Sequence, residues 1–213
     1  MTLKKFRHRF SRHLLFILIW PLILAPGLAW AQGEAGSGIY ENGNLILGVN
    51  KPAGVVTGYF ENCVGYDETT KRPRFCCIFF LYGKKEGTKY KITTWYPGTR
   101  DVIEGELRLP EPGKTNLFIK LKESPPGSMA YPFDVEKGND FPLESAGDWI
   151  EVRVVQAPKA YFHREPDAKS KRSAYVVKRD VVRVYEKKNG WVLAAYQKTK
   201  GWLKEKDLFS LHP

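Results

Sequence analysis

Histidine and cysteine are scarce in this sequence of 213 residues, which contains four histidines and three cysteines. A structural zinc site needs about four well-spaced ligands, and the chain has no Cys-x-x-Cys pair to supply them. The sequence also lacks a glycine-rich phosphate loop, a Gly-x-Ser-x-Gly nucleophile motif and a kinase signature. These absences predict a protein that uses no metal and no cofactor.

The few residues that could carry chemistry are isolated from one another. A Cys–His nucleophilic pair would require His163 to meet a cysteine from a different predicted domain. Glu104 and Glu106 share one face of a predicted strand, but that spacing is common on solvated faces and does not by itself define a glycosidase. We therefore predict that the protein is not an enzyme.

The only long apolar run of the sequence lies near its amino terminus. Residues 4–12 contain five basic side chains, residues 14–24 are apolar, and 29–31 read Ala-Trp-Ala. This order is typical of a secretory signal peptide cut after residue 31. The alternative is an uncleaved anchor, but Pro21 and Pro26 interrupt a run that needs roughly 20 residues to span a bilayer. Cleavage would release a mature chain of 182 residues (213 minus 31) into the periplasm or the medium.

Export would place the three cysteines in an oxidising compartment, where a disulfide is expected. Cys63 follows one strand-like run, and Cys76 and Cys77 begin the next, so Cys63 is predicted to pair with Cys76 or with Cys77. Adjacent residues of a strand face opposite ways, so only one of the two can point towards Cys63. The sequence leaves that choice open.

The first half of the mature chain has the pattern of an antiparallel β structure. Short runs rich in β-branched and aromatic residues alternate with Gly, Pro and Asn, as expected for a meander. The runs are 44–49, 54–60, 74–83, 90–96, 101–109 and 115–121. The run 74–83 is apolar on both faces, which favours a closed or strongly curled barrel. Residues 66–74 are predicted to form an exposed hairpin loop, and 123–145 an irregular cover.

The second half differs from the first in charge. Residues 151–213 carry a net charge of +8, whereas 32–150 carry −2, which indicates two modules. We predict a signal peptide (1–31), a flexible lead (32–38), an all-β domain (39–148) and a smaller β domain (149–213). The strand-like runs of the smaller domain are 149–155, 159–164, 174–179, 181–186, 191–197 and 201–204. Asn189-Gly190 predicts a tight hairpin turn, since both residues tolerate positive φ.

Four motifs follow one another near the carboxyl terminus. They are Arg164-Glu165-Pro166-Asp167, the turn Lys178-Arg179-Asp180, two Gly-Trp pairs at 190–191 and 201–202, and a closing Asp207-Leu208. In this order they resemble the bacterial SH3-like domain family over residues 159–208. The resemblance implies a five-stranded barrel and a non-catalytic module that holds on to cell wall or another protein. The family has glycine where this chain has Arg179, so the position either does not need positive φ or tolerates strain.

The first domain is similar in architecture to small exported barrels of the calycin-like group, with no shared motif. We therefore predict an exported binding protein whose SH3-like domain docks on peptidoglycan or an envelope protein. A sharper version has the protein inhibit a wall-degrading enzyme, with the loop 66–74 as a plug. The alternative is a carrier that holds a small apolar ligand inside the first barrel. The predicted cavity lining is Phe60, Phe75, Phe79, Phe80, Tyr90 and Trp95.

The predicted binding surface of the smaller domain centres on Trp191, because this residue follows a turn beside basic loops, whereas Trp202 is expected to be buried. The other candidates are Tyr161, Tyr185 and Lys188. Clustered lysines attract polyanions, and export makes an acidic wall polymer or protein a better partner than nucleic acid. We expect the protein to contact the membrane only through the signal segment, before cleavage. The sequence does not indicate an oligomeric state.

Overall fold

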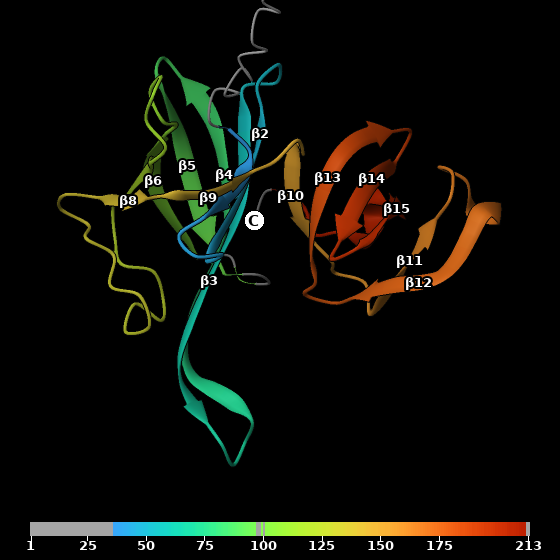
Figure 1. Ribbon diagram of the computed structural model, residues 1–213, viewed down its shortest axis with the longest axis horizontal. Coiled ribbons are helices and arrows are strands. Elements are labelled where there is room, and N and C mark those ends of the chain that lie inside the picture. The colour runs from blue at the N-terminus through green and yellow to red at the C-terminus, as the bar shows by residue number, and fades with distance from the viewer. Residues whose placement is uncertain (1–35, 97–98, 100, 212–213) are drawn as a thin grey trace, which may run out of the picture. The chain divides into compact units, whose positions relative to one another are not determined.

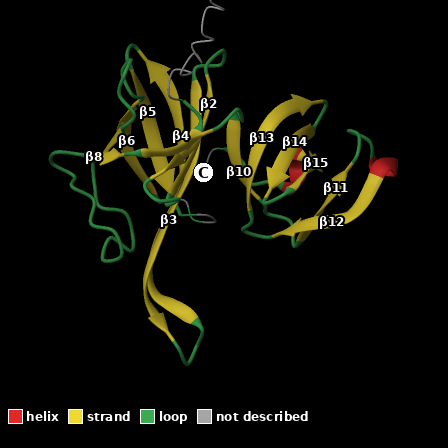
Figure 2. Ribbon diagram, in the orientation of Figure 1, coloured by secondary structure: helices red, strands yellow, loops and turns green. Residues whose placement is uncertain are grey.

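The computed structural model describes residues 36–96, 99 and 101–211, and across these ranges the protein is all-β, without an α-helix. The strands form two antiparallel sheets, one of nine strands and one of six, and Figures 1 and 2 show how the strands are arranged. The remaining regular elements are two short 3-10 segments, η1 (Ala168–Ser170) and η2 (Glu205–Asp207). The predicted fold class is confirmed. The predicted signal peptide lies outside the described residues, and in the described part no helix is long and apolar enough to cross a membrane.

The nine-stranded sheet is nearly closed into a barrel. Its strands are β1 (Gly38–Tyr40), β2 (Leu45–Asn50), β3 (Val55–Asp67), β4 (Arg72–Glu86), β5 (Lys89–Trp95), β6 (Val102–Arg108), β7 (Leu117–Leu121), β8 (Asn139–Phe141) and β9 (Leu143–Ala146). Strands β1 to β8 are neighbours in sequence order, and β9 returns to pair with β1. Pro142 alone separates the two edge strands β8 and β9. Proline suits this corner because it has no N–H to donate to a ladder.

Six strands of this sheet coincide with predicted runs, but two of them are longer than predicted. Strands β3 and β4 continue in register as far as the pair Asp67–Arg72. The predicted loop 66–74 is therefore wrong, and the turn comprises residues 68–71 only. Strands β1, β8 and β9 occupy segments predicted as lead or irregular cover. Each has only three or four residues, which is too short for an alternating pattern to be recognised.

Side chains fill the interior of the nine-stranded sheet. Phe60 and Phe79 stack at 4.9 Å between ring centroids, and Phe133 and Phe141 pack edge-on against Phe60. The six residues predicted to line a ligand cavity do not meet in one place. Phe60, Phe79 and Tyr90 belong to this interior, Phe80 and Trp95 form a cluster on the outer face, and Phe75 is exposed. The structure thus gives the carrier alternative no support.

The six-stranded sheet forms the small barrel predicted from the sequence. Its strands are β10 (Glu151–Val154), β11 (Lys159–His163), β12 (Lys171–Val177), β13 (Val181–Lys188), β14 (Trp191–Tyr196) and β15 (Thr199–Lys204). They pair in the order β10-β13-β14-β15-β11-β12. Buried Phe162, Val184 and Leu203 are among the side chains of its core. The Asn189-Gly190 turn has positive φ at both residues, 49° and 78°, as its sequence predicts.

Strand β10 belongs to the small barrel and also packs on the first sheet. A Cβ atom at Gly48 would lie 2.7 Å from the backbone of Glu151, so the close approach of β10 to β2 requires glycine. The hydroxyl of Thr57 accepts a hydrogen bond from Val152 N at 2.7 Å, and the Trp149 indole donates to the carbonyl of Leu47 at 2.8 Å. Residues 32–213 form one compact unit. The division into domains 39–148 and 149–213 stays a prediction.

An ion network lies beside this junction. Arg153 and Glu151 are both buried, and the Arg153 guanidinium lies 3.5 Å from Glu151 and 3.4 Å from Glu205. Lys187 contacts both carboxylates, and its hydrogen bond holds the pKa of Glu205 below the ordinary value. Arg153 also donates to the carbonyl of Phe209 at 2.7 Å, which ties the end of the described chain to β10.

Candidate binding surface of the small barrel

Two tyrosines and two lysines alternate on the outer face of β11 and β12. Tyr161 and Tyr175 are directly opposite in the antiparallel register, and their rings meet edge-on at 5.8 Å. The ammonium of Lys159 lies 3.7 Å from the centre of the Tyr175 ring, and that of Lys171 lies 3.6 Å from the centre of Tyr161. Cations at this distance are attracted by the ring quadrupole. We call these four residues the tyrosine–lysine face.

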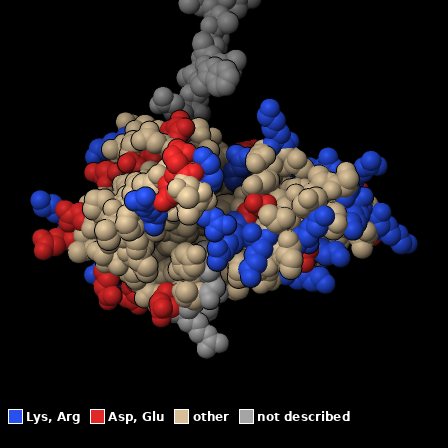
Figure 3. All heavy atoms as spheres, turned by 90° about the horizontal axis from the view of Figure 1, so that it is seen from below, with Lys and Arg blue, Asp and Glu red and all other residues tan. Residues whose placement is uncertain are grey.

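The tyrosine–lysine face is exposed and lacks a carboxylate of its own. Tyr175 and the neighbouring Val177 are two of the seven exposed large hydrophobic residues in the described part of the chain. Within the described residues, the ion pairs of this barrel all involve Glu151 or Glu205, so Lys159 and Lys171 have no acidic partner. Figure 3 shows Lys and Arg dominating the visible surface on the side of the small barrel. The face can therefore accept an external anion.

Trp191, the centre of the predicted site, has a different set of neighbours. It is half-buried, and its ring meets that of buried His163 edge-on at 4.7 Å. The Nδ1 atom of His163 lies 2.9 Å from the carbonyl oxygen of Asp167, so the imidazole is part of the barrel structure. Lys204 lies over Trp191 at 5.7 Å. Trp202 is buried as predicted, and its backbone pairs with His163.

The remaining predicted binding residues do not join one cluster. Tyr185 lies on β13, where Lys200 covers its ring at 3.4 Å. Lys188 is exposed and pairs in register with Trp191 at the end of the β13–β14 hairpin. The structure therefore places Tyr161, Tyr185 and Trp191 in three separate aromatic–cation contacts. The contacts of Lys159 and Lys171 with the tyrosine rings are not evident from the sequence, because they depend on the β11–β12 register, which shifts between Tyr161 and His163.

The turn that departs from the family pattern is strained. Arg179 has a φ of 79°, so the position does require the left-handed region and arginine tolerates it. The turn is held from both sides, because Arg179 N donates to Val155 O at 2.8 Å and the Asp180 carboxylate accepts from Val177 N at 2.8 Å. Arg179 and Asp180 line an open groove of about 440 Å³ together with Tyr59 and Glu61 of the first sheet.

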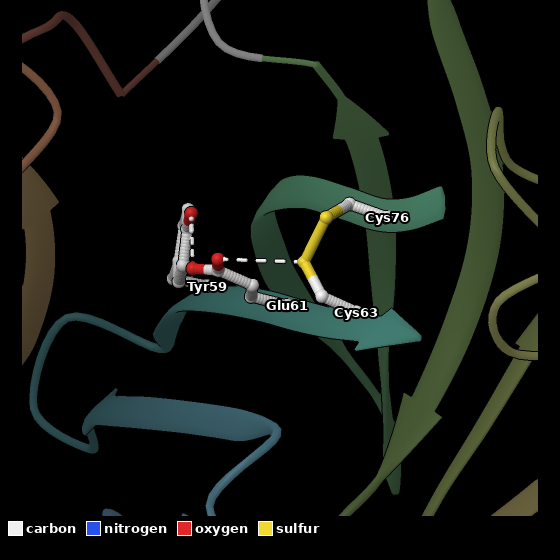
Figure 4. Close-up of a disulfide and its surroundings, with 4 residues drawn as sticks. All are labelled: Tyr59, Glu61, Cys63 and Cys76. Carbon is white, nitrogen blue, oxygen red and sulfur yellow. Dashed lines mark hydrogen bonds between the residues drawn. A yellow bond between two sulfur atoms is a disulfide. The ribbon is translucent and has the colours of Figure 1, made fainter. Parts of the chain in front are cut away.

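The disulfide joins Cys63 to Cys76, one of the two predicted pairings. These residues are directly opposite on β3 and β4, with Cα atoms 4.1 Å apart, whereas Cys77 points to the interior and is a buried free thiol. Figure 4 shows the bridge beside Glu61, whose carboxylate accepts a hydrogen bond from Tyr59 at 2.9 Å. The Cys63 sulfur lies 3.7 Å from Glu61, and because it is bonded to Cys76 it has no proton to donate.

The carboxylates of Glu104 and Glu106 each have a lysine partner. Lys122 contacts Glu104 and Lys89 contacts Glu106, both at 2.6 Å. These hydrogen bonds hold both pKa values below the ordinary value. A general acid needs a pKa shifted in the opposite direction. Among the described residues, no group of three or more His, Cys, Asp or Glu side chains could hold a metal ion.

A small barrel with an exposed aromatic and cationic face has the character of a binding module. Residues 156–209 match the family model of the bacterial SH3 domain, so this part of the chain is a bacterial SH3 domain and the predicted resemblance is confirmed. The family is generally a binding module, which supports a binding role for this protein. No curated protein and no solved structure matches the chain.

Proposed function

We propose that the protein is an exported, non-enzymatic binding protein whose SH3 domain docks on peptidoglycan or on an envelope protein through the tyrosine–lysine face. The observation that carries the proposal is that Lys159 lies on the exposed ring of Tyr175 and Lys171 on the half-buried ring of Tyr161, with no carboxylate partner for either lysine in the described part of the domain. An acidic ligand group could contact both ammonium groups while its apolar part covers the rings. Peptidoglycan carries such carboxylates beside sugar and peptide.

Export rests on the order of basic, apolar and small residues in segment 1–31. Edman sequencing of the protein recovered from its cells should give Gln32 as the first residue. Recovery of the uncleaved chain in the membrane fraction would favour the anchor alternative instead.

Sedimentation with purified peptidoglycan tests the docking surface. The double variant Lys159→Ala/Lys171→Ala should lower the retained fraction about tenfold, because it removes two charge-assisted contacts. The matched control is Lys198→Ala/Lys206→Ala, which removes the same charge from the same domain without touching an aromatic ring. Equal loss in both variants would show that only net charge matters and would contradict a specific face.

A protein partner is tested with the same variants by pull-down from an envelope extract. The sharper version of the proposal, inhibition of a wall-degrading enzyme, is favoured by a projecting hairpin of the first sheet rather than by the SH3 domain. A decrease in the rate of peptidoglycan lysis on addition of the mature protein would support it. An unchanged rate with every wall-lytic enzyme of the same envelope would exclude it.

A further inference from the structure

The hairpin of β3 and β4 extends beyond the rest of its sheet, as Figure 1 shows. Strand β2 pairs with β3 only as far as Phe60, and β5 pairs with β4 only from Phe80 onwards. Residues 62–77, which we call the finger, therefore pair along their strands only with each other. Beyond the base, where Gly127 packs on Cys76, the outer edges of the finger present backbone groups that are available to a partner.

Beyond the pair Asn62–Cys77 at its base, one face of the finger is apolar and continues the barrel interior. The register places the pairs Val64–Phe75 and Tyr66–Pro73 on the same face as the buried pair Phe60–Phe79. The side chains of this face emerge from the barrel into solvent. Val64, Tyr66 and Phe75 are 41%, 60% and 45% exposed, which makes three of the seven exposed large hydrophobic residues of the described chain. Such grouping marks an interaction site.

The finger is held in shape before any partner binds. The Cys63–Cys76 disulfide ties its two strands together, and Arg74 bridges to Asp67 at 3.0 Å nearer the tip. At its base, Gly127 packs so closely on Cys76 that a Cβ atom there would lie 2.0 Å from the Cys76 carbonyl oxygen. A preordered element loses little conformational entropy on binding.

The charged residues at the tip of the finger indicate which kind of partner its apolar face can bind. Asp67, Glu68, Lys71, Arg72 and Arg74 surround the turn. A tip with five charged side chains would be costly to bury in hydrocarbon, so the apolar face is not suited to a bilayer. Within the described residues, Asp67 and Glu68 are paired with Arg74 and Lys71, whereas Arg72 has no acidic partner.

A second copy of the chain also fits the finger poorly. Two fingers packed face to face would bury only a few side chains each, far below the about 1,200 Å² of a stable interface. A cleft has two walls, so a finger inserted between them can contact the partner with both of its faces and with its outer edges.

We propose that the finger inserts into the cleft of a partner protein that offers an apolar wall to Val64, Tyr66 and Phe75 and carboxylates to Arg72 at the tip. The finger itself carries three basic and two acidic side chains, and this excess of one positive charge at the tip complements an acidic cleft. This inference concerns a surface separate from the tyrosine–lysine face and names the partner chemistry for the inhibitory version of the proposed function.

The test uses the full mature chain as bait on an envelope extract, followed by purification of the captured protein and calorimetry. Replacing two central aromatic anchors, Tyr66→Ser/Phe75→Ser, should weaken binding of the purified partner at least about tenfold. Val102→Ser is the control, because Val102 is 47% exposed and lies on β6, which β5 separates from the finger strand β4. Arg72→Ala should also weaken binding of the purified partner, because it removes the basic group assigned to the partner's carboxylates.

Three outcomes overturn the inference: no captured protein depends on Tyr66 and Phe75, vesicles of anionic phospholipid bind with the same dependence, or the finger drives self-association. The finger variants should sediment with peptidoglycan as the wild type does. Peptidoglycan binding by Lys159→Ala/Lys171→Ala therefore tests only the docking proposal. The finger inference is tested separately, by the binding of the purified partner.

Discussion

At the residue scale, Arg179 stands where the bacterial SH3-like pattern has glycine, and its backbone nevertheless adopts the left-handed region. The φ of 79° shows that this position requires a left-handed backbone conformation, which glycine adopts more readily than other residues. The backbone partners of the turn, Val155 and Asp180, hold the strained residue in place. Such strain is often retained where a side chain has a role, and Arg179 lines the groove beside Tyr59 and Glu61.

Arg179→Gly should therefore leave the fold intact and raise the free energy of unfolding by up to about 1 kcal/mol. Relief of left-handed strain is worth roughly 1–2 kcal/mol, and the greater freedom of glycine in the unfolded chain offsets part of it. Urea unfolding measures the change. The matched variant Gly190→Ala, at a φ of 78° with open space around its Cβ, should shift stability the other way. A decrease with Arg179→Gly would mean that the guanidinium makes a stabilising contact.

At the scale of single elements, strands with a clear alternating pattern could be predicted and the shortest strands could not. All six strands of the small barrel overlap predicted runs, because each contains β-branched or aromatic residues. Strands β1, β8 and β9 exist only because β1 pairs with both β2 and β9, and β8 pairs with β7. Pairing between segments more than 100 residues apart leaves no trace in local composition.

The same limit applies to the candidate site. Tyr161 could be identified from its place among basic residues, but its direct pairing with Tyr175 follows from the strand register. The finger was recognised as a hairpin, yet the length of its strands could not be read from the charged residues at its tip. Charged residues such as Asp67 and Arg72 remain in strands here because their backbones are directly opposite in the β3–β4 ladder.

The disulfide gives an element-scale prediction. Cys63→Ser/Cys76→Ser should lower the free energy of unfolding by about 2–3 kcal/mol, since the bridge closes a loop of 13 residues in separation. The amide protons of the finger should exchange faster while those of the barrel core stay protected. Hydrogen exchange followed by NMR measures both effects. Wild-type protein treated with a reducing agent is the control and should match the variant, and uniform loss of protection would contradict a local role.

At the scale of the whole molecule, the buried ion network beside β10 makes stability depend on pH. Hydrogen bonding by Lys187 lowers the pKa of Glu205, so the folded state favours its ionised form. Its contribution is present above the unfolded-state pKa and is lost as the pH falls through the folded-state pKa. Between pH 6 and 3 the free energy of unfolding should fall more steeply for wild type than for Glu205→Gln. Parallel curves in urea titrations at each pH would refute a role for this carboxylate.

Strand β10 determines which residues must be included if the SH3 domain is transferred to another protein. The family match begins at residue 156, after β10 has ended, although β10 is the strand that pairs with β13. A gene segment cut at the family boundary would leave its edge strand behind, together with the contacts of Trp149 and Val152 to the first sheet. A transplanted domain would need residues 149–155 as well. In this chain the segment that matches the family model is thus shorter than the segment that pairs as one sheet.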